Sequence, residues 1–169
     1  MGNSADAKNF YWDSCVWIRL INKEPGYDDC EYVIERARAG EFQIWSSTLV
    51  LAEVVKTKIP GGWIQMAAIN DVAFEDFVQQ DFVTQVQLDR DVALKARRLL
   101  RAHSALKKPN DAIHVASALI YNVDELHTID STDLLPLNGK ENGNDGTPLV
   151  IRVPPTRPPP EPESARLFE

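Results

Sequence analysis

The chain has few cysteines, no long apolar run and neither of the common nucleotide-binding motifs. Only Cys15 and Cys30 occur among its 169 residues, too few for a disulfide framework. No apolar stretch approaches the roughly 20 residues that span a bilayer, and the chain does not open with a charged segment followed by an apolar one. The absence of GxxxxGKS/T and GxGxxG disfavours a nucleotide-driven motor and a dehydrogenase. A reducing, cytoplasmic setting without a membrane span is expected.

Metal-ligand spacing of the zinc type is also missing. The three histidines, His103, His114 and His127, are scattered along the chain. His114 follows Asp111 by three positions, so it either borders an acidic site or packs in the core, and packing is the more common outcome. The net charge of -7 argues against a generically basic nucleic-acid binder. A carboxylate cluster that holds cations would itself contribute to that negative total.

The composition is that of a folded protein with one domain and an appendage. Hydrophobic residues make up 44% of the chain and charged residues 25%. We expect a flexible polar leader at residues 1–9 and one domain at residues 10–153, which contains an extended polar loop at 138–147. Eight of the 11 prolines follow residue 134, and residues 154–169 have the composition of a proline-rich tail.

Short apolar strands alternate with helical patterns along the domain. Strands are predicted at residues 10–12, 42–45, 82–88 and 126–129, with a further edge strand at 149–153. Helices are predicted at residues 14–22, 27–39, 48–58, 63–80, 89–108 and 110–121. This alternation indicates an α/β fold, in which helices cover both faces of a parallel sheet.

Four carboxylates stand in apolar sequence where predicted strands end or helices run: Asp13, Glu53, Asp111 and Asp130. Each has an ordinary explanation, as a helix cap for Asp13 and Asp111, a turn residue for Asp130, or an exposed helix edge for Glu53. Glu53 is the hardest to explain in this way, because no basic residue lies three or four positions upstream of it. Burial would raise its pKa and neutralise it unless a cation keeps it ionised.

The combination of the four acids favours a metal site. Acids at the carboxyl ends of parallel strands converge at one edge of the sheet, where they repel one another unless cations lie between them. Oxygen ligands suit Mg²⁺ or Mn²⁺ better than Zn²⁺. Asp133 lies one helical turn beyond Asp130 and competes with it for the same role.

In order and local context, the motifs YWDSCVWI, SSTLVLAEVV, KPNDAIHVASAL and HTIDSTDL resemble the acidic motifs of PIN-domain nucleases, particularly the small VapC-like toxin ribonucleases. The resemblance covers roughly residues 10–134. It implies a Rossmann-like three-layer α/β/α sandwich with a central parallel sheet, one or two Mg²⁺ or Mn²⁺ ions, and hydrolysis of RNA phosphodiester bonds. The expanded loop and the tail depart from the family pattern.

Residue roles follow from the same resemblance. It implies metal ligation and catalysis by Asp13, Glu53, Asp111 and Asp130, with Asp133 as a further ligand. Asp13 and Asp111 are expected to be direct ligands, and Glu53 either a ligand or a base that orients water. The hydroxyls of Ser14 and Thr128 are expected beside the site.

The resemblance also implies partners for the protein, and two alternative functions remain beside it. A toxin of a type II toxin–antitoxin pair would have an RNA substrate, a small antitoxin and a second copy of itself as partners. One alternative is a catalytically weak PIN-fold module that binds RNA or a protein partner. Another is a metal-dependent phosphohydrolase that acts on small phosphate esters.

A run of basic residues precedes the third acid. Six of the 18 basic residues, and no acid, lie between Lys95 and Lys108. Arg97, Arg98 and Arg101 fall on one face of the predicted helix, which predicts contacts with an RNA phosphate backbone. A solvated helix face, or contact with an acidic partner, explains the run at least as well.

Overall fold

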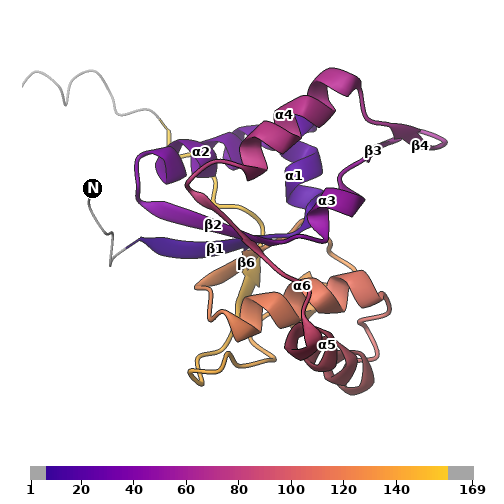
Figure 1. Cartoon of the computed structure of the whole chain (residues 1–169), viewed down its shortest axis with the longest axis vertical. Coiled ribbons are helices and arrows are strands. Elements are labelled where there is room, and N and C mark those ends of the chain that lie inside the picture. The colour runs from indigo at the N-terminus through magenta and orange to yellow at the C-terminus, as the bar shows by residue number, and fades with distance from the viewer. Residues whose placement is uncertain (1–6, 160–169) are drawn as a thin grey trace, which may run out of the picture.

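Five parallel strands form the centre of the protein (Figure 1). The computed structural model describes residues 7–159. The strands are β1 (Lys8–Trp12), β2 (Phe42–Ser47), β5 (Val83–Val86), β6 (Glu125–His127) and β7 (Val150–Arg152). Their order across the sheet is β5-β2-β1-β6-β7, and every neighbouring pair is parallel. The predicted parallel sheet, including its edge strand near the end of the domain, is confirmed.

Helices cover both faces of this sheet. Figure 1 shows α1 (Ser14–Ile21), α2 (Tyr27–Arg38) and α4 (Ala68–Val78) on one face, and α5 (Arg90–Ala102) and α6 (Pro109–Ile120) on the other. Parallel strands need such crossover connections, and the helices bury both faces of the sheet. The protein is therefore the predicted three-layer α/β/α sandwich.

The alternation of side chains along β1 supplies both layers of the core. Phe10 and Trp12 point into the cluster formed with α1, α2 and α4, where the rings of Trp12 and Trp17 meet edge to face at 4.8 Å. Tyr11 points into the opposite cluster, formed with α5 and α6. Because successive side chains of a strand face opposite sides, this short central strand anchors both layers and fixes where its carboxyl end lies.

The region around Pro60 differs from the prediction. The expected helix at residues 48–58 is wrong beyond α3 (Val50–Glu53), and the expected helix at 63–80 begins only at Ala68. Between them, β3 (Lys56–Ile59) and β4 (Gly62–Gln65) form an antiparallel hairpin. Gly61 and Gly62 have φ values of 94° and 151°, which side chains disfavour, and the β-branched residues before Pro60 prefer strands.

The end of the described chain returns across the molecule to α2. A short 3₁₀ helix, η1 (Leu135–Leu137), and the polar loop at 138–147 lead into β7. Beyond β7, Arg157 forms two hydrogen bonds with Glu35 at 2.9 Å, and its N–H donates to Asp29 Oδ1. The first residues of the expected tail are thus held against α2, and residues 160–169 lie outside the described range.

The start of the domain also differs slightly from the expectation. β1 begins at Lys8, so Lys8 and Asn9, which were assigned to the leader, belong to the sheet. Residues 1–6 of the expected leader lie outside the described range. Among the helices of residues 7–159, none is long and apolar enough to cross a membrane.

Candidate metal centre

The carboxyl ends of β1 and β6 meet at the point where the strand order reverses. β1 pairs with β2 on one side and with β6 on the other. Asp13 follows β1 directly and Thr128 follows β6 directly. Open α/β sheets bind ligands in the crevice at such a switch point. The fold therefore places two of the residues singled out in the sequence at the expected position for a ligand.

Asp13 is buried and joins the ends of these two strands. Its Oδ2 accepts a hydrogen bond from Thr128 Oγ1 at 2.5 Å, and its Oδ1 accepts bonds from the Val16 N–H at 3.2 Å and from Cys15 Sγ at 2.8 Å. Burial raises the pKa of Asp13, and the surrounding donors offset only part of that effect. The helix-cap interpretation is confirmed, since the Val16 N–H belongs to the first turn of α1.

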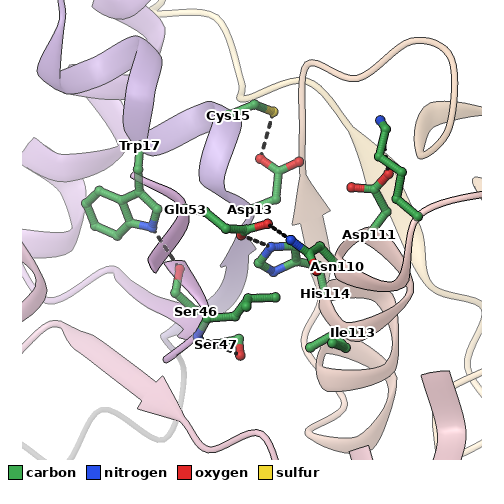
Figure 2. A network of polar contacts seen from close by, with 12 residues as sticks. Asp13, Cys15, Trp17, Ser46, Ser47, Glu53, Asn110, Asp111, Ile113 and His114 are labelled. Carbon is green, nitrogen blue, oxygen red and sulfur yellow. Dashed lines mark hydrogen bonds and ion pairs between the residues drawn. The ribbon is translucent and has the colours of Figure 1, made fainter. Parts of the chain in front are cut away.

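Glu53 is the last residue of α3 and is held by α6 (Figure 2). Its Oε2 lies 2.8 Å from His114 Nε2, and its Oε1 accepts a hydrogen bond from Asn110 Nδ2 at 2.9 Å. Burial alone would raise the pKa of Glu53, but its bonds to His114 and Asn110 and the Ser14 side chain bring that pKa below its ordinary value. The premise that Glu53 lacks a partner is wrong, because its partners lie 57 and 61 residues further along the chain.

A buried chain of donors fixes the orientation of His114. The Ser47 N–H donates to the Tyr11 hydroxyl oxygen at 3.0 Å, and the Tyr11 hydroxyl lies 2.9 Å from His114 Nδ1. Burial raises the pKa of Tyr11, so the hydroxyl keeps its proton and can donate it to Nδ1. Nε2 then carries the ring hydrogen and donates to Glu53. His114 is thus a packed histidine, 1% exposed, that also borders the acidic residues.

Three further carboxylates meet beside Asp13: Asp111, Asp130 and Asp133, together called the acidic triad. One oxygen from each lies within 4.8 Å of the other two. Asp130 Oδ1 accepts hydrogen bonds from the N–H groups of Thr132 and Asp133, both at 2.9 Å, and the Asp130 N–H donates to Thr128 Oγ1. The predicted turn role of Asp130 is confirmed, and this turn also brings Asp133 into the triad.

Lys108 supplies the positive charge beside the acidic triad. Its Nζ lies 2.7 Å from Asp133, 3.4 Å from Asp111 and 3.7 Å from Asp130. The hydrogen bond to Asp133 raises the pKa of Lys108 and lowers that of Asp133. Burial raises the pKa of Asp111 despite the nearby ammonium. One cation thus balances part of a charge that three acids share.

The donor set of the acidic triad fits a hard divalent cation. Ligand oxygens about 2.1 Å from Mg²⁺ lie up to about 4.2 Å apart, so a spread of 4.8 Å would close with a small side-chain movement. Among residues 7–159, Asp111 Oδ2 is a buried oxygen without a hydrogen-bond partner, and its contact with Lys108 at 3.4 Å is an ion pair of poor hydrogen-bond geometry. An oxygen that lacks donors while remaining buried is a suitable ligand.

The structure brings together most of the residues predicted for the site. Asp13 and Thr128 are joined directly, the acidic triad includes three of the acids, and Figure 2 shows Glu53 between α1 and α6. Asp13 lies outside the triad itself. Arg97, Arg98 and Arg101 are exposed on α5, the helix that packs beside α6.

Sequence reasoning missed Lys108 and Asn110 as members of this region. Lys108 was assigned to the basic run of α5, although its spacing of three residues from Asp111 places the two side chains on neighbouring positions at the start of a helix. Asn110 has no distinguishing pattern in the sequence. Its bond to Glu53 depends on the packing of α3 against α6, which local sequence does not reveal.

The fold and the gathered acids define an α/β protein with an acidic centre at the switch point of its sheet. The sequence model of the PIN-domain family matches residues 10–133, so the chain belongs to this family. No curated protein sequence matches it.

Two solved structures share this fold. VapC20 of Mycobacterium tuberculosis, described as a sarcin–ricin loop cleaving toxin, is 17% identical with a TM-score of 0.54, over 72% of this chain and 89% of that one. VapBC2 of Rickettsia felis, solved bound to a DNA fragment from its promoter, is 16% identical with a TM-score of 0.55, over 85% of this chain and 96% of that one. The predicted PIN-like, VapC-like fold is confirmed.

Proposed function

We propose that this protein is a metal-dependent endoribonuclease and the toxin of a type II toxin–antitoxin pair. The observation that carries the proposal is the convergence of the acidic triad with Asp13 at the switch point of a PIN-family sheet. The likeness of the fold to a toxin that cleaves the sarcin–ricin loop supports RNA as the substrate class.

Asp111, Asp130 and Asp133 would hold the ion, and Mg²⁺ or Mn²⁺ suits their oxygen atoms. The Thr128 hydroxyl connects Asp13 to the acidic triad, because Oγ1 donates a hydrogen bond to Asp13 and accepts one from the Asp130 N–H. Asp13 would serve as a further ligand or as the residue that fixes Thr128 and the Asp130 turn. These assignments place four of the five predicted ligands, all except Glu53, in one region.

The chain's own groups would position the reactants. When bound, one or two divalent ions would supply activation of water and neutralisation of the charge that develops on the phosphate. Glu53, held by His114 and Asn110, would accept a hydrogen bond from that water and orient it. The Ser14 side chain, which influences the pKa of Glu53, would help to hold the carboxylate.

Substrate and partners complete the proposal. Arg97, Arg98 and Arg101 form an exposed row on α5 that would bind the RNA backbone. A small antitoxin would cover the acidic centre, and a second copy of the chain would complete a homodimer. The likeness of the fold to VapBC2 supports the antitoxin partner.

The test is an RNA cleavage assay with the purified full chain. A fluorescently labelled RNA pool should be cut at internal sites in Mn²⁺, and cleavage should stop in excess EDTA. Asp13→Asn and Asp111→Asn should abolish cleavage without unfolding the protein, as measured by circular dichroism. Full activity of either pure variant would refute the assignment of that residue.

The second candidate is a PIN-fold module that binds RNA or a protein without cutting RNA. It is favoured by the internal compensation of the acids, since Lys108 balances the triad and His114 with Asn110 holds Glu53. Calorimetric titration with MnCl₂ separates the two candidates. A nuclease should bind Mn²⁺ and turn over RNA, whereas absence of both would favour the module.

A further inference from the structure

Lys108 is the cation that lies at the acidic triad in this structure. Its ammonium is within 3.7 Å of all three carboxylates, and its contact with Asp133 is a hydrogen bond of 2.7 Å. An ion ligated by the triad needs oxygens of the same three carboxylates that this ammonium contacts. The lysine and a divalent ion therefore compete for one set of ligands.

The backbone keeps Lys108 at this position. It is the residue before α6, and Pro109 follows it as the first residue of the helix. A residue before proline is restricted to extended conformations, and Lys108 has φ -102° and ψ 130°. Its Cα is thereby fixed one turn before Asp111, so its side chain starts beside the triad.

The side chain, by contrast, can leave the triad. Its exposed fraction is 62%, compared with 6% for the side chain of Asp133. An exposed lysine gives up little when it moves into water, because its ammonium is already largely hydrated and ion pairs of exposed side chains are weak. A buried lysine would resist displacement, and an absent one would leave three carboxylates to repel one another.

We propose that Lys108 is a resident counter-ion that a divalent cation must displace from the acidic triad, so that this lysine sets how much metal the protein needs. This inference rests on the proposed metal site and goes beyond it by assigning a role to a residue that is not a ligand. It predicts that the protein binds metal less tightly than its carboxylates alone would allow.

The test is calorimetric titration of the full chain with MnCl₂, which does not depend on nuclease activity. Lys108→Met keeps the length of the side chain and removes the charge, and it should lower the Kd for Mn²⁺ by about tenfold. Lys107→Met is the matched control: it removes the same charge from an exposed neighbour that has no ion pair with a described acid. Its effect should stay within about twofold, because solvent screens the longer-range attraction between Lys107 and Asp133.

Two further measurements guard against a general effect of charge or folding. Lys108→Arg keeps a cation at the triad and should bind Mn²⁺ no more tightly than the wild type. In EDTA, Lys108→Met should melt at a lower temperature than Lys107→Met, because the triad loses its counter-ion. The increase in melting temperature on addition of Mn²⁺ should be larger for Lys108→Met than for either the wild type or Lys107→Met.

The outcomes separate this inference from the proposed function. If Mn²⁺ binds the wild type but Lys108→Met binds it no more tightly than Lys107→Met, Lys108 does not compete and the inference is overturned while the metal site stands. If neither the wild type nor any variant binds Mn²⁺, the inference and the proposed metal dependence both fail.

Discussion

Two groups of carboxylates at the same edge of the sheet are balanced in different ways. Asp13 and Glu53, here called the two hydrogen-bonded acids, each accept hydrogen bonds from donors in the packed interior. Thr128 is such a donor for Asp13, and His114 for Glu53. The acidic triad is balanced by Lys108, whose side chain is 62% exposed. The first arrangement is part of the folded core, whereas the second uses a cation that can be exchanged. Substitutions in the first group should therefore lower stability as well as activity, whereas substitutions in the second should affect mainly metal-dependent activity.

The largest effect should follow from Asp111→Asn in the acidic triad. Loss of a ligand charge should lower the RNA cleavage rate by about 1000-fold, which corresponds to about 4 kcal/mol of barrier. The free energy of unfolding in EDTA should change by less than about 1 kcal/mol, because the ion pair to Lys108 is partly exposed. Asp76→Asn on the exposed face of α4 is the control and should leave both measurements unchanged.

His114→Ala should instead remove a partner of Glu53, one of the two hydrogen-bonded acids. The change leaves a cavity and removes a partner from both Glu53 and the Tyr11 hydroxyl, so it should lower the free energy of unfolding by about 2–4 kcal/mol. Urea denaturation in EDTA measures it. His103→Ala removes a more exposed histidine that contacts Glu141, and it should cost about 1 kcal/mol or less. Equal losses for the two variants would contradict the buried role of His114.

Thr128→Val tests the hydroxyl that links Asp13 to the Asp130 turn. Valine matches the shape of threonine but leaves Asp13 Oδ2 and the Asp130 N–H without this partner, which should cost about 1–3 kcal/mol of unfolding free energy. Thr128→Ser keeps the hydroxyl and should recover most of that loss. Chemical denaturation of the two variants decides the point, and a serine variant as unstable as the valine variant would show that the methyl group matters more.

The row of arginines on α5 should affect RNA binding alone. Replacing Arg97, Arg98 and Arg101 with alanine should reduce the magnitude of the slope of log K against log salt by about 2. Each phosphate contact on a single strand contributes about 0.7 to that slope, and three contacts would be lost. The measurement is fluorescence anisotropy of a labelled RNA in the Asp111→Asn background, which prevents cleavage. Arg38→Ala, on α2 at the opposite face of the sheet, is the control. An unchanged slope would mean that the row is a solvated helix face.

The smallest effect concerns pH and His127, a buried residue of β6. Trp12 Nε1 donates to its Nδ1 at 3.1 Å, which holds the ring neutral, and burial lowers the pKa of His127 despite the nearby Glu125. The unfolded chain, with a histidine pKa near about 6.5, then binds more protons than the folded one. The contribution of neutral His127 to the free energy of unfolding is therefore fully present above that pH and is lost as the pH falls toward the folded-state pKa. Urea denaturation at pH 7.5 and at pH 5.5 measures this loss, and His127→Gln should reduce it by about 1 kcal/mol.

The sequence predicted the sheet and its layers because strands and helices differ in the period of their apolar residues. It failed between Thr48 and Gln65, where apolar residues near Glu53 matched a helical period. The hairpin there is set by the paired backbones of β3 and β4 and by the positive φ of Gly61, which apolar periodicity does not encode. Local pattern was overridden by pairing and turn geometry.

The site was predictable in part for a related reason. Asp13, Thr128 and Asp130 follow strands, so the topology of a parallel sheet was enough to bring them together. The partners of Glu53 depend instead on how α3 packs against α6, across more than 50 residues of sequence. Lys108 was visible only as one of several basic residues, and its role required the distances to three separate acids.

The most direct test of the account is the anomalous diffraction of a crystal of the wild-type protein grown with Mn²⁺. We predict an anomalous peak bound by oxygens of Asp111, Asp130 and Asp133, with the Lys108 ammonium displaced from Asp133. A structure without a peak at the triad, in which Lys108 Nζ remains in contact with Asp133 at saturating Mn²⁺, would contradict it.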